Sequence, residues 1–81
     1  MEKNLAIYKK NFIESFGINE INLEKLKYQD IPEWDSVGHM GLMNSIEESF
    51  KIELEIDDII DFSSFQKGIE ILSKYNISFN E

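Results

Sequence analysis

The sequence predicts an all-α fold of four helices, arranged as a single domain over residues 1–81. Hydrophobic residues recur every three or four positions in three stretches, which places them on one face of an α-helix. Residues that favour helix starts or ends border these stretches. One stretch, 52–56, alternates as a strand would, but no other segment could pair with its backbone, so we expect a loop there. The predicted helices span about 3–16, 36–50, 57–61 and 64–75.

The first helix is predicted from one hydrophobic face and from Gly17, a residue that favours a helix end. That face consists of Leu5, Tyr8, Phe12 and Phe16. Residues 17–35 then form a long connection, because Pro32 disfavours helix at Ile31 and polar residues separate the hydrophobic ones. Its hydrophobic side chains must dock on the core, and a short helical turn is expected near residues 23–27.

The second helix starts after Asp35, a residue type that favours the N-cap position. Its hydrophobic face, which we expect in the core, consists of Met40, Met43, Ile46 and Phe50. The third helix is short and begins at Asp57. Ser63 and Gln66 match a capping box at the start of the last helix, which continues to about Tyr75.

Composition narrows the range of functions. The chain has no Cys and one His, and no nucleophile pairs with a base, so we expect no enzymatic activity and no disulfide. A domain of this size buries only about 60% of the surface of its unfolded chain, which favours a binding or carrier role over a deep catalytic pocket. The acids do not follow the pattern of a calcium-binding loop, and we predict no metal site.

The charge distribution indicates the kind of partner. The net charge of −8 repels nucleic acids and anionic membranes, so we expect partners with basic patches. Residues 30–81 carry twelve acids and three bases, which places the expected recognition surface in the second half. No hydrophobic stretch approaches the roughly 18 residues of a membrane span, and the first ten residues lack the core of a secretory signal. We therefore expect a cytoplasmic protein, and we expect it to be a monomer.

The most informative motif is Trp34-Asp35-Ser36-Val37, at the predicted start of the second helix. The first N–H groups of a helix lack intrahelical partners, and the helix dipole favours negative charge there. A phosphodiester on Ser36 would therefore be stabilised by these groups. Asp35 could cap the helix and help to hold a divalent metal ion when a modifying enzyme binds. An Asp-Ser pair alone is weak support, because most such pairs are simple caps.

From Asp35 to Leu72 the sequence resembles the acyl carrier and peptidyl carrier protein family without a gap. The matching features are an Asp-Ser pair, hydrophobic positions at helical spacing, paired acids and a serine before the last helix. They comprise Asp35, Ser36, Leu42, Ile46, Glu47, Glu48, Phe50, Ile52, Leu54, Asp57, Asp58, Ile69 and Leu72. Over residues 1–30 only the amphipathic helix and the long connection correspond.

The resemblance implies a four-helix bundle of the acyl-carrier type, with a long loop between helices one and two and a short third helix. It also implies that Ser36 carries covalent 4′-phosphopantetheine, which holds acyl or aminoacyl groups as thioesters. The partners would be a phosphopantetheinyl transferase and acyl- or aminoacyl-loading enzymes and acyltransferases. The expected partner-binding residues are Val37, Met40, Glu47, Glu48, Glu53, Asp57 and Asp58.

Several features separate this chain from the members of the family that serve fatty-acid synthesis. Gly38 and Gly41 stand where those members carry acids, and each glycine costs the helix roughly 1 kcal/mol relative to Ala. A Trp directly before the Asp-Ser pair, as Trp34 is here, resembles the sequences of stand-alone carriers of polyketide, nonribosomal-peptide or sugar-modifying pathways. Lys51 occupies a position where a helix-ending glycine is frequent in the family. We therefore expect a carrier of a specialised pathway. The alternatives are the housekeeping fatty-acid carrier and a non-carrier interaction module that retains the carrier fold.

Simpler roles remain open for some of these residues. The acids could form an ordinary solvated surface. His39 lies one turn after Ser36 and could contact the arm or a partner, although an isolated exposed histidine usually has no special role. Met40 and Met43 are expected in the core, and together with Ile59 they could line a small expandable cavity for an acyl chain.

Overall fold

The computed structural model describes residues 3–79 of the chain. This part contains helices and no strand, so the prediction of an all-helical fold is confirmed for it. The elements are α1 (Lys3–Phe16), the short 3₁₀ helix η1 (Leu23–Lys25), α2 (Ser36–Phe50), α3 (Ile56–Asp61) and α4 (Phe65–Ser73). None of the helices described between residues 3 and 79 has the length and hydrophobicity needed to cross a membrane.

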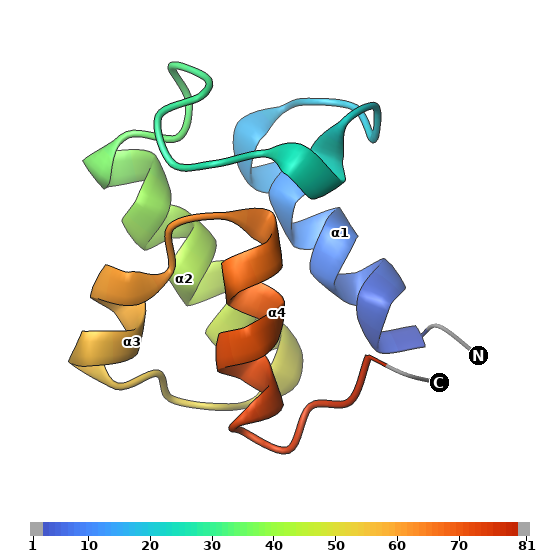
Figure 1. The fold of residues 1–81 in the computed structure, drawn as a ribbon, viewed down its shortest axis with the longest axis vertical. Coiled ribbons are helices and arrows are strands. Elements are labelled where there is room, and N and C mark those ends of the chain that lie inside the picture. The colour runs from blue at the N-terminus through green and yellow to red at the C-terminus, as the bar shows by residue number, and fades with distance from the viewer. Residues whose placement is uncertain (1–2, 80–81) are drawn as a thin grey trace.

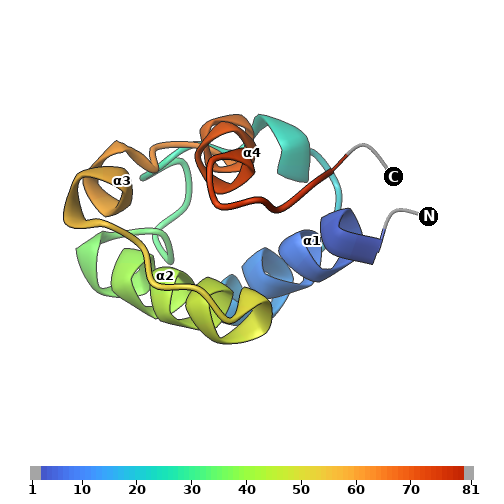
Figure 2. The same cartoon turned by 90° about the horizontal axis from the view of Figure 1, so that it is seen from below.

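The helices form two layers (Figure 1). Figure 2 shows α1 and α2 in one layer, with α4, α3 and η1 in the other. The connection between α1 and α2 reaches the second layer through η1 and docks there on the segment that precedes α4. Two backbone hydrogen bonds hold it, one from the Tyr28 N–H to the Ser63 carbonyl and one from the Phe65 N–H to the Leu26 carbonyl, both at 2.9 Å. The long connection is therefore part of the folded body and not a free loop.

Aromatic side chains fill the space between the layers. Tyr8, Phe12, Trp34, Phe62 and Phe65 are all fully or almost fully buried. The rings of Phe12 and Trp34 meet edge to face with their centroids 5.4 Å apart. The Tyr8 hydroxyl donates to the Phe65 carbonyl over 2.7 Å, which satisfies its polar group inside the core. Trp34 thus anchors the backbone two residues before Ser36.

A buried amide pairs the two long helices. Asn11 on α1 accepts hydrogen bonds at its side-chain oxygen from the hydroxyls of Ser45 and Ser49 on α2. Its amide nitrogen donates to the Ile7 carbonyl over 2.8 Å. Because a buried amide is stable only when its polar atoms are paired, this cluster favours one register between α1 and α2.

The ends of α2 and α4 refine the predicted boundaries. Lys51 adopts the left-handed conformation after α2, with φ of 57°, and so takes the place of the expected helix-ending glycine. The capping box predicted at Ser63 is wrong, because Ser64 is the N-cap of α4 and its hydroxyl accepts from the Lys67 N–H over 2.9 Å. The Ser63 carbonyl instead accepts a hydrogen bond from the Tyr28 N–H, which links Ser63 to the connection between α1 and α2.

The predicted core face of α2 needs one correction. Met43 and Ile46 are buried with Leu42, but Met40 is about half exposed. Phe50 is half-buried and packs against the edge of the core. Met40 therefore lies at the border of the core, where it can take part in surface contacts.

Candidate functional site

Ser36 lies at the first position of α2, with its side chain exposed. Asp35 is the N-cap, as predicted, and its carboxylate accepts from the Gly38 N–H over 2.8 Å. The first main-chain bond of the helix runs from the His39 N–H to the Asp35 carbonyl. The N–H groups of Ser36 and Val37 come before that bond and have no intrahelical acceptor, so this end of the helix favours an anion.

Gly38 allows the chain to turn tightly into α2. A Cβ atom at this position would overlap the backbone carbonyl of Glu33, which lies just before Trp34. Gly41, one turn later, faces open space. The two glycines that the sequence presents as equal departures therefore differ, since only Gly38 is required by a close backbone approach.

An open hydrophobic cleft of about 330 Å³ lies beside Ser36, between α2 and α3. Its floor and walls are aromatic and aliphatic, with two serines at the edge. The lining residues are Tyr28, Ser36, His39, Met40, Ile59, Ile60, Phe62 and Ser63. The predicted cavity residues Met40 and Ile59 line this cleft, whereas Met43 does not, because it is buried in the core.

His39 is not the isolated surface residue that the sequence suggested. Its ring is half-buried and lies between the connection and α3. Nδ1 accepts from the Trp34 indole N–H over 2.9 Å, and Nε2 is 2.8 Å from the Ile59 carbonyl. His39 therefore connects the segment before Ser36 to α3 through both ring nitrogens.

Four exposed hydrophobic side chains lie on the two helices that border the cleft, and Met40 and Ile60 among them line it. Val37 and Met40 on α2, two of the predicted partner-binding residues, are 80% and 47% exposed, and Ile56 and Ile60 on α3 are 74% and 71% exposed. The two isoleucines were not among the predicted site residues. Their four-residue spacing gives them a shared face on a helix as short as α3, while Ile59 turns inward. We call Val37, Met40, Ile56 and Ile60 the apolar rim.

Some acids of the predicted acidic surface are exposed, whereas others bind groups within the fold. Glu48, Glu53 and Asp57 are exposed. The Glu47 carboxylate is half-buried and accepts from the Leu54 N–H over 2.7 Å, which closes the loop after α2. The expectation that Glu47 belongs to a freely exposed face is therefore corrected, because its charge stabilises the loop backbone.

Asp58 also departs from the expected surface role, because it is buried against the end of α4. Its two carboxylate oxygens lie 2.6 Å from the Lys74 ammonium and 2.5 Å from the Tyr75 hydroxyl. The hydrogen bond from Lys74, followed by that from Tyr75, lowers the pKa of Asp58 below its ordinary value. The same contact raises the pKa of Lys74, while burial and the bond to Asp58 raise the pKa of Tyr75. Asp58 therefore holds α3 to α4.

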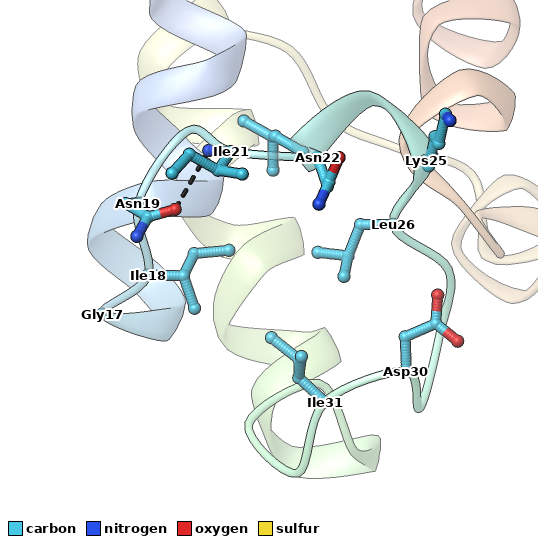
Figure 3. A pocket seen from close by; sticks show the side chains of 10 residues that line it. Gly17, Ile18, Asn19, Ile21, Asn22, Lys25, Leu26, Asp30 and Ile31 are labelled. Carbon is cyan, nitrogen blue, oxygen red and sulfur yellow. Dashed lines mark hydrogen bonds between the residues drawn. The ribbon is translucent and has the colours of Figure 1, made fainter.

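A second hollow of about 530 Å³ lies along the connection after α1 and shares no lining residue with the cleft beside Ser36. Figure 3 shows Ile18, Leu26 and Ile31 pointing into it. The Ile21 N–H donates to the Asn19 side chain over 3.0 Å at its edge. The hollow contains no predicted site residue. Across residues 3–79, no three His, Asp or Glu side chains come together as metal ligands would.

No protein-family model, curated protein or solved structure matches the chain. Its function must therefore be inferred from the residues themselves.

Proposed function

We propose that the chain is an acyl carrier protein that bears 4′-phosphopantetheine on Ser36 and holds acyl or aminoacyl groups as thioesters. The observation that carries this proposal is an exposed hydroxyl at the first position of a 15-residue helix, beside a hydrophobic cleft. A phosphodiester formed there would be negatively charged and would lie where the helix terminus favours an anion. The chain itself performs no catalysis in this account.

The residues around Ser36 fit this cofactor. The hydroxyl is accessible to a modifying enzyme, and Asp35 next to it supplies a carboxylate that could help to hold that enzyme's divalent ion. The arm would start at the edge of the cleft, where Met40 and Ile59 offer hydrophobic surface to an attached acyl chain. The cofactor would supply the thiol, and the protein would supply its attachment and surroundings.

The apolar rim supports a docking role for α2 and α3. Partner proteins commonly bury a small hydrophobic centre and surround it with charged contacts. Here Val37, Met40 and Ile60 would provide the centre, and the exposed Asp57 and Glu53 would meet basic groups on the partner. The partners we propose are a phosphopantetheinyl transferase and acyl- or aminoacyl-loading enzymes and acyltransferases.

The first turn of α2 favours a specialised pathway over housekeeping fatty-acid synthesis. It contains no acid after the cap, since Val37 and Gly38 follow Ser36. The surface nearest the proposed arm is therefore more hydrophobic than a purely electrostatic docking site would be. We also propose the acyl-carrier type of bundle, a monomeric state and a cytoplasmic location for this protein.

The competing function is an interaction module that keeps the carrier fold without the cofactor. Co-expression with a phosphopantetheinyl transferase of broad specificity, followed by intact mass analysis, separates the two. A carrier gains one phosphopantetheine in wild type and in Ser63→Ala, and none in Ser36→Ala. Ser63 is a matched control because it lines the same cleft and is also exposed. Unmodified wild-type chain with several active transferases would favour the interaction module.

A further inference from the structure

A continuous chain of hydrogen bonds runs through two residues that line the cleft, His39 and Ile59. It runs from the Trp34 indole through the His39 ring to the backbone of Ile59 on α3. Both distances, 2.9 and 2.8 Å, are typical of well-formed hydrogen bonds. The chain joins the residue two positions before Ser36 to the middle of the short helix across the cleft.

The chemistry of the two end groups fixes the state of the imidazole. The indole of Trp34 can only donate, so Nδ1 of His39 must be an acceptor. The Ile59 carbonyl can only accept, so Nε2 must carry the proton. The bridge therefore requires neutral His39 in one tautomer, with each nitrogen in a different role.

Ring packing holds His39 in this orientation. The Trp34 and His39 rings are nearly parallel, with an angle of 18° and centroids 6.2 Å apart. Tyr28 and Phe62 meet the imidazole edge to face at 5.6 and 6.1 Å. Three rings thus restrict the side chain, and little conformational freedom remains to be lost when both hydrogen bonds form.

The need for such a bridge follows from the weak attachment of α3. The helix has six residues and no side-chain cap at its start. Asp58 ties it to the end of α4, and His39 ties it to the α2 side through Ile59. A helix this short depends on tertiary contacts for its stability.

We propose that His39 is a positioning residue that holds α3 at a fixed place across the cleft from Ser36. The two halves of the apolar rim, one on α2 and one on α3, then keep one arrangement that a partner can recognise. His39 itself need not touch the cofactor or the partner. This inference deepens the proposed function and rests on it for the partner step, whereas the bridge is a property of the unmodified chain.

Two substitutions separate the halves of the bridge. His39→Asn places an amide oxygen near the position of Nδ1 and cannot reach Ile59. His39→Gln places an amide nitrogen near the position of Nε2 and lacks the acceptor for Trp34. The probe is hydrogen exchange followed by NMR, and the single Trp of the chain gives one indole signal. Exchange is expressed as protection relative to a free group, so that the pH dependence of the chemistry itself is removed.

We expect opposite patterns in the two variants. His39→Asn should keep the protection of the Trp34 indole and lower that of the Ile59 and Ile60 amides by about tenfold, the factor for about 1.4 kcal/mol and one lost hydrogen bond. His39→Gln should lower the indole protection and keep that of the α3 amides. Equal effects of both variants, or no loss of protection in either one, would overturn the bridge.

The partner step is tested with a phosphopantetheinyl transferase and coenzyme A. Movement of α3 should weaken docking and leave the attacking hydroxyl unchanged, so His39→Asn should raise KM several-fold at constant kcat. His39→Gln keeps the contact with Ile59, so its KM and kcat should equal those of wild type. A raised KM in both variants would reject the positioning role. If wild type is not modified at all, the proposed function fails, while the exchange data still decide whether the bridge exists.

Discussion

The carboxylate of Glu47 accepts a hydrogen bond from the Leu54 N–H over 2.7 Å, across the loop that follows α2. Its neighbour Glu48 is exposed and has no such role in the loop. Two adjacent acids that were predicted to share one surface therefore have different structural roles. Glu47 stabilises the backbone that leads to α3, whereas the Glu48 side chain is exposed to solvent.

This difference predicts unequal effects of Glu47→Ala and Glu48→Ala. Glu47→Ala leaves the N–H of the buried residue Leu54 without its charged acceptor and should lower the free energy of unfolding by about 1–3 kcal/mol. Glu48→Ala, as the matched control, should change it by less than about 0.5 kcal/mol. Urea unfolding followed by circular dichroism measures both. Equal losses in the two variants would contradict the assigned role of Glu47.

The glycines of α2 give a second pair of variants. Gly38→Ala should lower the free energy of unfolding by about 1–3 kcal/mol, because the new Cβ meets the Glu33 carbonyl and forces the backbone apart. Gly41→Ala should raise it by about 0.5–1 kcal/mol, because the position is open and Ala favours helix. Thermal unfolding of the two variants should shift in opposite directions. A stabilising Gly38→Ala would show that the turn before α2 is placed incorrectly.

The Asp58 contacts predict a specific acid sensitivity. The pKa of Asp58 is lowered by Lys74 and Tyr75, so the folded state binds the carboxyl proton less readily than the unfolded state. Its contribution to stability is present above the unfolded Asp pKa, near 3.9, and is lost as pH falls through the lower folded value.

The advantage of wild type over Asp58→Asn in urea unfolding should therefore be largest near pH 7 and shrink from about pH 5 downward. Asp57→Asn, which removes the neighbouring and exposed carboxylate, serves as the control for the loss of one negative charge. An advantage that stays constant between pH 7 and pH 3 would mean that the Asp58 contacts do not form in solution.

The helices were predictable because they depend on local spacing and on residues that favour helix starts. The residue type of Asp35 predicts a cap, and in the structure its carboxylate accepts from the Gly38 N–H. Ser63 and Ser64 are both good caps, and sequence alone could not decide between them. The connection between α1 and α2 decides which serine caps α4, because its Tyr28 N–H donates to the Ser63 carbonyl.

The features of the site that could not be predicted from the sequence depend on contacts between residues far apart in the chain. His39 gains its role from Ile59, twenty residues away, and Asp58 gains its role from Lys74. Nothing in the spacing near either residue signals such a partner. Ile60 was not signalled by the sequence either, because Ile56, Ile59 and Ile60 have the i, i+3, i+4 spacing typical of one core-facing helix face. Only the structure shows that Ile60 is exposed.

If the apolar rim is the docking surface, we expect Ile60 to contribute strongly to recognition by the phosphopantetheinyl transferase. Ile60→Ser should lower the kcat/KM of phosphopantetheinylation by roughly 10- to 150-fold, since burial of such a side chain is worth about 1.5–3 kcal/mol. Ile21→Ser is the matched control, because Ile21 is 76% exposed beside the other hollow, compared with 71% for Ile60. Both variants should melt close to wild type. A similar loss in both would remove the argument for a localised docking surface.

The most direct test of the carrier assignment is to incubate the purified chain with coenzyme A, magnesium and a phosphopantetheinyl transferase, and then to locate any added group by fragment mass spectrometry. The exposed position of Ser36 at the start of α2 predicts a single phosphopantetheine on Ser36, and none on Ser63 or Ser64. An unmodified chain with several active transferases, or a group attached to another serine, would contradict the assignment.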